Sequence, residues 1–243
     1  AAVLILGTSI EGQGPRRVAL GDWPELRGPN RHGVSKEKNL PEKWALNGEN
    51  FLWRVPYGGR SSPIVMGNHV YVENPSGRGT ELQERVMCLD TDTGKVIWEY
   101  KFNIYQSDVP PHRVGWASPT ADPETGDVYA LSVGAQVIAL SKDGKLLWQR
   151  SIGEEWAAFT THGGRTMSPM VDGNLVIVSA AISSWGTSNN RAHRLVALDN
   201  RTGEIVYISN PGERPYDTAF ACRLSQPWLR WAWVTSQTSR DLP

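Results

Sequence analysis

The chain has 243 residues, with 25 basic and 25 acidic side chains, and 40% of its residues are hydrophobic. This length can form one sizeable core, and the balanced charge gives no electrostatic argument for a nucleic acid or a charged membrane surface as the partner. No run after Gly12 approaches the roughly 18 apolar residues that a spanning helix needs, so we expect no transmembrane segment.

Residues 1–14 resemble the distal half of a signal peptide, because an apolar run at residues 3–6 precedes small and polar residues. The segment has no initiating Met and no basic region. We therefore expect the remnant of a signal peptide on a chain that is clipped at its start, and an exported protein. The alternative is a packed or disordered N-terminal arm.

Residues 15–60 are expected to form an arm that ends in one strand. The segment 22–44 is polar, rich in turn residues and without a clear period, whereas residues 50–56 read Asn-Phe-Leu-Trp-Arg-Val-Pro. We expect 50–56 to be a lone outer strand that carries Trp53 and has no partner nearby in the sequence.

Three related units follow the arm. Each begins with a Ser-Pro pair, and the serines lie 56 and 50 residues apart. Each also contains a hairpin with a turn glycine, and these glycines lie 50 and 59 residues apart. A period near 50 with four short strands per unit is typical of propeller blades. The landmarks are Ser62, Ser118 and Ser168, and Gly94, Gly144 and Gly203.

The predicted fold is all-β, a β-propeller of four-stranded antiparallel blades, with about three blades present and the ring incomplete. In such rings the first and last segments often share one blade, which removes exposed sheet edges. Residues 50–56 are therefore expected to await partners from the C-terminal side. The blades are expected within residues 61–218, at 61–100, 117–150 and 167–209, with loops between them.

The pattern Leu-Asp-x-x-Thr-Gly-Lys-x-x-Trp at residues 89–98 resembles the tryptophan-docking motif of quinoprotein dehydrogenases and of other propellers with pyrrolo-quinoline-quinone-like (PQQ-like) repeats. Residues 23–30 resemble the entry arm of exported bacterial members, which implies a periplasmic or secreted protein. In the family this Trp packs against the next blade, and a large flat side chain buries roughly 150–250 Å². The resemblance implies docking roles for Trp53, Trp98, Trp148 and, in a looser joint, Tyr207.

Residues 219–243 lose the repeat, with three Trp in six residues and no turn landmark. We expect this aberrant tail to be the premature or frame-shifted end of a longer gene. The alternative is an amphipathic terminal segment that caps an open ring.

Function is expected on one side of the blades. In a four-stranded meander, the second turn and the link to the next blade lie on the side opposite the first and third turns. That side, which we call the long-loop face, carries the connections 73–85, 99–116, 149–166 and 179–194. Connections longer than a turn requires are where binding residues usually lie.

Three side chains on the long-loop face immediately precede inner strands, and a glycine precedes each of them. Arginine suits a carboxylate and tryptophan suits a planar ring, so a quinone, a peptide or a sugar acid would fit. The alternative is structural, with the arginines bonding carbonyl groups between blades. We predict that these residues ring the mouth of the central channel: Arg60, Trp116 and Arg165, with Gly59, Gly115 and Gly164.

No metal site is predicted. His112, His162 and His193 fall on the long-loop face but lack a short ligand spacing, so solvated loop histidines are the simpler interpretation. The quinone enzymes of the family hold PQQ between a Trp and an adjacent-cysteine disulfide, with calcium bound by Glu and Asn. Here Cys88 and Cys222 are not adjacent, and no motif assigns the calcium ligands or a catalytic base to numbered residues.

The resemblance therefore implies a non-catalytic binding or scaffold module, similar in fold to the assembly lipoproteins of the outer membrane. Its partner would be a protein or a carbohydrate on the long-loop face, and no cofactor is assured. The alternative is a PQQ-dependent dehydrogenase of alcohols or sugars, which would use PQQ with calcium.

Overall fold

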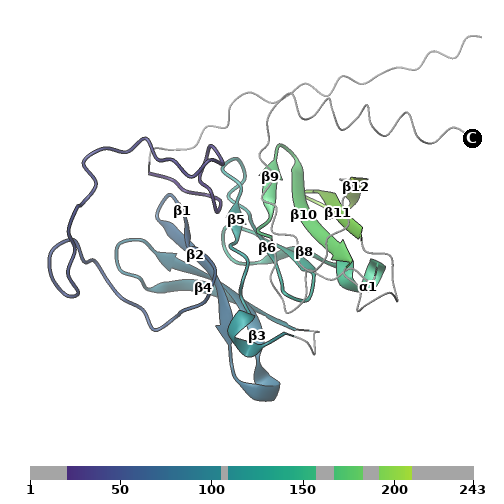
Figure 1. The fold of residues 1–243 in the computed structure, drawn as a ribbon, viewed down its shortest axis with the longest axis horizontal. Helices are drawn as coiled ribbons and strands as arrows, with labels where there is room; N and C mark the ends of the chain where they lie inside the picture. Colours follow the sequence, from purple (N-terminus) through teal and green to yellow (C-terminus); the bar gives the residue numbers. More distant parts are fainter. Residues whose placement is uncertain (1–20, 105–108, 157–166, 183–191, 210–243) are drawn as a thin grey trace, which may run out of the picture.

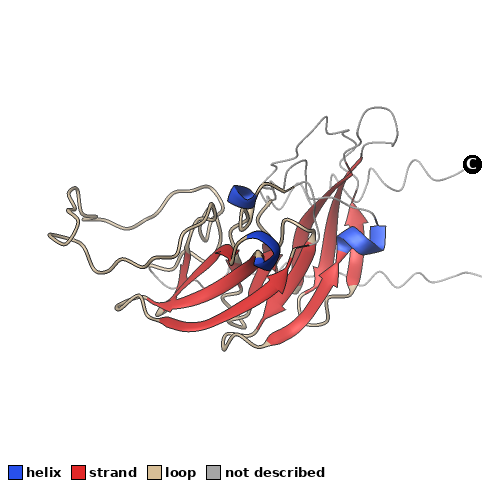
Figure 2. Cartoon of the chain, turned by 90° about the horizontal axis from the view of Figure 1, so that it is seen from below, coloured by secondary structure: helices blue, strands red, loops and turns tan. Residues whose placement is uncertain are grey.

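The computed structural model describes residues 21–104, 109–156, 167–182 and 192–209 (Figure 1). Within these ranges the strands form three four-stranded antiparallel sheets, each with its strands in chain order. The sheets stand side by side as blades in an arc, as the view from below also shows (Figure 2). The expected all-β propeller of four-stranded blades is confirmed.

The strands of the three blades have the following bounds. Blade one contains β1 (Ile64–Met66), β2 (His69–Ser76), β3 (Gln83–Asp90) and β4 (Val96–Asn103). Blade two contains β5 (Thr120–Ala121), β6 (Val128–Leu131), β7 (Gln136–Leu140) and β8 (Leu146–Ser151). Blade three contains β9 (Met170–Asp172), β10 (Leu175–Ile182), β11 (Ala192–Asp199) and β12 (Ile205–Ser209).

Short helical segments lie between some of the strands. They are the 3-10 turns η1 (Gly79–Glu81) and η2 (Pro111–Arg113) and the single-turn helix α1 (Ile152–Trp156). In the part of the chain that the structure describes, no helix is long and apolar enough to cross a bilayer.

The outer hairpins of blades one and three share one turn chemistry. The Asp90 carboxylate accepts hydrogen bonds from the hydroxyl and the backbone N–H of Thr93, at 2.6 and 2.8 Å, and both bonds lower the pKa of Asp90. Asp199 accepts the same pair of bonds from Thr202. Gly94 then adopts a φ of 67°, which glycine tolerates without a Cβ clash. The Asp-x-x-Thr-Gly sequence therefore forms the turn.

The middle strands of blade two, β6 and β7, are buried on both faces, which explains their nearly continuous apolar sequences. Val128 and Ala130 of β6 pack into a cluster with blade one, and Tyr129 and Leu131 pack into a cluster with blade three. Successive side chains of a strand point to opposite faces. A strand between two neighbouring blades therefore needs apolar residues at every position.

The Ser-Pro landmark joins the inner strands. The Ser118 hydroxyl accepts a hydrogen bond from the Ser62 N–H at 2.8 Å, and the Ser168 hydroxyl accepts one from the Ser118 N–H at 2.9 Å. A buried backbone N–H requires an acceptor. Each serine supplies that acceptor to the preceding blade, which gives a physical reason for its repetition.

The N-terminal arm crosses the inner strands of all three blades. Trp23 exchanges two backbone hydrogen bonds with Val65, at 2.7 and 3.0 Å, and the Ala121 N–H donates to the Pro24 carbonyl at 2.8 Å. Arg31 then donates to a carbonyl group of β9. These inner-strand residues lie beside the first turns of their blades, so the arm covers the end of the inner strands opposite the long-loop face (Figure 1).

Several segments differ from the expectation drawn from the sequence. β4 extends into the predicted connection 99–116, β8 and α1 extend into 149–166, and β10 and β11 extend into both ends of 179–194. β2 and β3 pair without interruption from His69–Asp90 to Ser76–Gln83, so most of the connection 73–85 is a long hairpin rather than a loop. Residues 50–56 contain no strand. A strand needs a hydrogen-bonded neighbour, and the described part of this segment contacts blade one through the Trp53 side chain instead.

Candidate functional site

Three tryptophans each lie on the turn glycine of the following blade. A Cβ added to Gly94, Gly144 or Gly203 would lie only 2.5–2.6 Å from an indole carbon, so the glycines leave room for the rings. Each indole N–H also donates to a carbonyl group of that turn or the residue beside it. These bonds are Trp53 to Thr91 (2.7 Å), Trp98 to Lys142 (2.9 Å) and Trp148 to Asn200 (2.9 Å).

The residue that pairs with Trp98 or Trp148 on the neighbouring strand is small, which leaves room for the indole ring to pack against its own blade. Ala139 pairs with Tyr129 on one side and Trp148 on the other, and these two rings lie 6.1 Å apart. Cys88 has the place of Ala139 in blade one. Tyr207 has the place of the tryptophan in blade three, where it is 40% exposed, compared with 9% for Trp148.

Two of the predicted mouth residues lie in contact. The guanidinium of Arg60 is 5.2 Å from the ring centroid of Trp116, the geometry of a cation–π contact. Arg60 also donates from Nε to the His112 carbonyl at 2.8 Å, which is the structural bond between blades weighed above. Because the Arg60 side chain is exposed, the stacked pair also faces solvent. Arg165 and Gly164 lie outside the described residues, as does His162.

The predicted glycines of the mouth pack on one strand. A Cβ on Gly59 would lie 3.0 Å from the Glu73 carbonyl, and a Cβ on Gly115 would lie 2.6 Å from the Asn74 Cα. The two segments that carry Arg60 and Trp116 therefore both rest on β2. Gly115 also has a φ of 70°, which other residues adopt only with strain.

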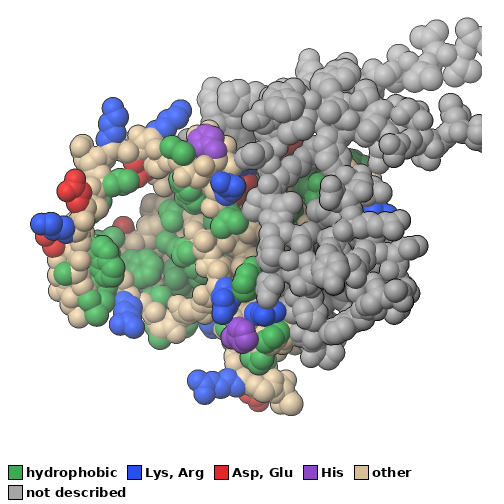
Figure 3. Space-filling view, in the orientation of Figure 1, with side chains coloured by type: hydrophobic (Ala, Val, Ile, Leu, Met, Phe, Trp, Pro, Cys, Tyr) green, Lys and Arg blue, Asp and Glu red, His purple; other side chains and the backbone are tan. Residues whose placement is uncertain are grey.

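Basic side chains surround this mouth. Figure 3 shows Lys or Arg side chains, with one His, over the β2–β3 hairpin and η2. Arg85 lies 5.2 Å over the ring of Tyr57, and an open hollow of about 580 Å³ is lined by residues 54–58. The basic and His residues of this surface are Arg60, Arg78, Arg85, His112 and Arg113.

Two glutamates are buried directly beneath the mouth. Glu73 of β2 and Glu84 of β3 are both 0% exposed. Glu84 accepts hydrogen bonds from the backbone N–H of Gly115 at 2.9 Å and of Val133 at 3.1 Å, both of which belong to blade two. Among the described residues, no donor lies within hydrogen-bond distance of either carboxyl oxygen of Glu73.

Burial governs the charge of both glutamates. It raises the pKa of Glu73 well above its ordinary value, and the neighbouring Glu84 raises it further. Burial also raises the pKa of Glu84, to about 7, although the two backbone N–H groups favour its carboxylate. Glu73 is therefore the group that holds a proton at neutral pH.

The sequence contains a signal for this pair that motif reasoning missed. Glu73 follows Tyr71 by two residues, and Glu84 precedes Val86 by two, while Tyr71 and Val86 both belong to the core between blades one and two. Since side chains two apart on a strand share a face, alternation alone places both carboxyl groups in that core.

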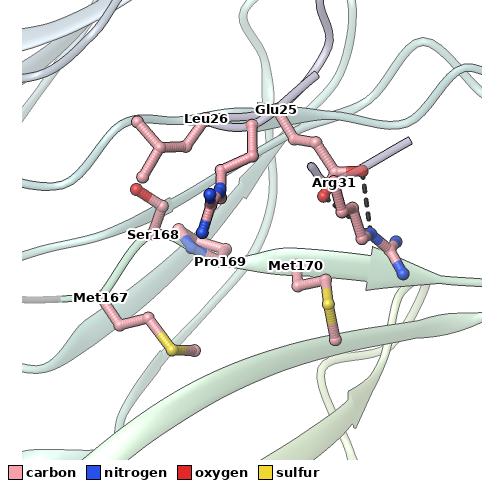
Figure 4. A pocket seen from close by; sticks show the side chains of 8 residues that line it. Glu25, Leu26, Arg31, Met167, Ser168, Pro169 and Met170 are labelled. Carbon is pink, nitrogen blue, oxygen red and sulfur yellow. Dashed lines mark hydrogen bonds and ion pairs between the residues drawn. The ribbon is translucent and has the colours of Figure 1, made fainter. Parts of the chain in front are cut away.

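A second, smaller pocket lies where the arm meets blade three. Figure 4 shows Glu25 and Arg31 paired on one side and Met167 and Met170 on the other. The ion pair is 3.0 Å long and its side chains are 12% and 8% exposed, for Arg31 and Glu25 respectively. The cavity measures about 30 Å³, enough for one or two waters but not for an organic ligand. This pocket anchors the arm.

We expect Arg31→Ala to destabilise the protein by about 1.5–3 kcal/mol, because Glu25 loses a charged partner and β9 loses a donor. Urea denaturation measures the change, and limited proteolysis should cut the arm faster. The exposed Arg27 lines the same pocket, so Arg27→Ala serves as the control. Equal stability of the two variants would show that the arm is anchored elsewhere.

Curated relatives of this chain are enzymes. It is 28% identical over 153 residues to a quinoprotein ethanol dehydrogenase of Pseudomonas putida, across 62% of this chain and 23% of that enzyme. It is 27% identical over 187 residues to a quinoprotein ethanol dehydrogenase of Pseudomonas aeruginosa, across 76% of this chain and 27% of the enzyme. The chain thus spans about a quarter of the length of these relatives.

Solved structures with a similar fold include a europium-containing methanol dehydrogenase, with a TM-score of 0.47 and 22% identity over 63% of this chain and 25% of that one. BamB from Moraxella catarrhalis has a TM-score of 0.39 and 17% identity, over 65% of this chain and 54% of that one. The family model described as outer membrane protein assembly factor BamB matches residues 85–230. The chain therefore belongs to this family of proteins with PQQ-like propeller repeats.

Proposed function

We propose that this protein is an exported, non-catalytic binding module that engages a protein partner at the Arg60–Trp116 mouth of its long-loop face. The observation that carries the proposal is the exposed, stacked pair itself. Arg60 is held by the Trp116 ring and the His112 carbonyl, so little side-chain entropy remains to be lost when a carboxylate binds. The family description, an assembly factor, supports a protein partner.

The surroundings of the mouth favour an acidic partner. The basic residues of the same surface complement carboxylate groups, and complementary charge speeds association. The arm covers the opposite end of the inner strands, which favours the long-loop face for a partner. A sugar acid would offer the same carboxylate chemistry.

A photo-crosslinking residue distinguishes the two faces. We expect a crosslinker at the exposed position His112, in the native host, to form an adduct with one protein, and the adduct to be lost with Arg60→Ala. The same crosslinker at Asn68, on the first turn of blade one, should form no such adduct. Adducts from Asn68 alone would contradict the proposal, and a polysaccharide adduct at His112 would favour the carbohydrate partner.

The similarity to quinoprotein ethanol dehydrogenases raises a second candidate function, a PQQ-dependent dehydrogenase. The described residues do not fit the cofactor. The Arg60 guanidinium already lies over the Trp116 ring, so a planar ring that stacked on that face would first have to displace a cation. No three His, Cys, Asp or Glu side chains in the described ranges are close enough together to hold a metal ion. We derive no catalytic step from this candidate.

Calorimetric titration of PQQ with calcium tests this second function directly. The binding module predicts no heat of binding to a folded sample. Micromolar binding that is lost in an Arg60→Ala, Arg165→Ala double variant would favour the dehydrogenase class. It would also mean that the quinone binds at the channel mouth. The matched control is Arg27→Ala, which changes an exposed arginine of the arm.

A further inference from the structure

The Glu73–Glu84 pair connects both sides of the mouth to one point in the core. The Ser61 hydroxyl donates to the Glu73 carbonyl at 2.6 Å and accepts from its N–H at 3.1 Å, and Ser61 directly follows Arg60. The Glu84 carboxylate holds the N–H of Gly115, which directly precedes Trp116. A change at the pair therefore reaches both stacked side chains.

The two carboxyl groups are within reach of each other. Glu73 lies opposite Val86 in the β2–β3 ladder, and Glu84 lies opposite Pro75, so the glutamates are diagonal neighbours on one face. Diagonal partners in a sheet are close enough for long side chains to touch. Two carboxylates in contact without water cannot both be ionised at low cost.

A shared proton fits this arrangement better than a metal ion. Two backbone N–H groups already point at Glu84, and such donors repel a cation. Asn74 is also committed, because its Oδ1 accepts from Arg85 at 3.0 Å. A proton on Glu73 needs only one acceptor, and the adjacent carboxylate of Glu84 provides it.

We propose that Glu73 and Glu84 form a proton-dependent latch between blades one and two. In the closed state Glu73 is the acid and donates to Glu84, which also holds Gly115 and Val133 of blade two. Loss of that proton leaves two buried negative charges, which repel each other and loosen the joint beneath Arg60 and Trp116. The latch does not depend on which partner the mouth binds.

The charged groups on the elements around the pair have the following partners and exposure. On β3 and β4, Arg85 bonds Asn74 and pairs with Glu99 at 3.0 Å. On the mouth segment, Arg60 bonds a carbonyl group and stacks on Trp116. On η2, His112 is exposed and Arg113 is half-buried. The β6–β7 connection, 132–135, carries no charged side chain.

The sign of the pH dependence follows from proton uptake on folding. Glu73 is protonated when folded but ionises near pH 4.5 when unfolded. The stability that the Glu73 proton contributes is therefore fully present below about pH 4.5. It is lost as the pH rises through the pKa of Glu73 in the folded protein. One proton taken up on folding lowers the folding equilibrium constant about tenfold per pH unit. From about pH 7, the pKa of Glu84, up to the folded pKa of Glu73, the wild type should show this loss, beyond what Glu73→Gln shows.

The test is urea denaturation of the full chain across this pH range, for wild type and Glu73→Gln. Gln keeps the shape of the side chain and a donor toward Glu84 but cannot ionise. The tenfold decrease of the folding equilibrium constant per pH unit should therefore disappear in this variant. Glu99→Gln is the matched control, since Glu99 is a solvent-accessible strand glutamate with a lowered pKa, and it should keep the wild-type slope. Hydrogen exchange at pH 9 should be faster at Gly115 and Val133 in wild type than in Glu73→Gln.

A second measurement uses the wild type alone and so does not depend on a variant that folds. Infrared spectroscopy about one pH unit above the pKa of Glu84, where that group is mostly ionised, should still show the carbonyl band of an un-ionised carboxyl group in the folded protein. Its absence would overturn the proposal, as would identical pH slopes for wild type and Glu73→Gln. Stabilisation of wild type but not Glu73→Gln by calcium alone would replace the shared proton with a bound cation and equally overturn it.

Discussion

Trp148→Ala is expected to reduce the free energy of unfolding by about 3–5 kcal/mol, the range for truncating a large aromatic side chain in a core. Trp148 is 9% exposed and packs between Tyr129 of its own blade and Gly203 of the next. Its loss opens a cavity between blades two and three and leaves the Asn200 carbonyl without the indole donor. Urea denaturation followed by circular dichroism measures the change.

The repeat supplies the controls for this variant. Tyr207 has the equivalent place in blade three but is 40% exposed, so Tyr207→Ala should cost about 1 kcal/mol or less. Trp148→Phe keeps most of the packing and removes only the hydrogen bond, for about 1 kcal/mol. If Tyr207→Ala and Trp148→Ala cost the same, contact between blades would not be the source of the effect.

Gly115→Ala is expected to destabilise the protein by about 2–5 kcal/mol, the sum of two costs. A φ of 70° costs a residue with a Cβ about 1–2 kcal/mol. The added carbon would also lie 2.6–2.9 Å from three backbone atoms of Asn74, which cannot rotate away as a side chain can. Overpacking of this kind costs a further 1–3 kcal/mol or so.

Gly67→Ala isolates the first of these costs. Gly67 has a φ of 57°, but a Cβ there would meet no atom within 4 Å, so only about 1–2 kcal/mol should be lost. Thermal unfolding of the two variants at one pH gives the comparison. A Gly115→Ala variant as stable as Gly67→Ala would mean that β2 and the mouth segment are not in close contact.

The blades were predictable because their signals are local. The Asp-x-x-Thr-Gly turn of blades one and three, the Ser-Pro landmark of all three units and the apolar run of β6 each lie within a few residues. Contacts between segments also require glycine at these turns, because each turn glycine is covered by an indole ring from the preceding segment. In the sequence, only the repetition of the motif indicates this requirement.

The course of the arm and the contact between Arg60 and Trp116 have no local sequence signal of this kind. The arm reaches β9 through Arg31 and Val171, 140 residues apart, and its polar sequence has no period that indicates a partner. Arg60 and Trp116 lie in contact, and that contact depends on the β2 strand beneath them. That strand is longer than its apolar pattern indicates, because a buried glutamate interrupts the apolar residues.

The arm also has a consequence for the order of folding. Each blade forms from contacts between neighbouring segments of the chain, whereas the arm must find one partner in each of three blades. Contacts between residues far apart in sequence form slowly, because closing a long loop costs entropy before any contact is gained. The arm leaves the ribosome before the blades and is nevertheless the last of these segments to dock, and until then the inner strands are uncovered at that end.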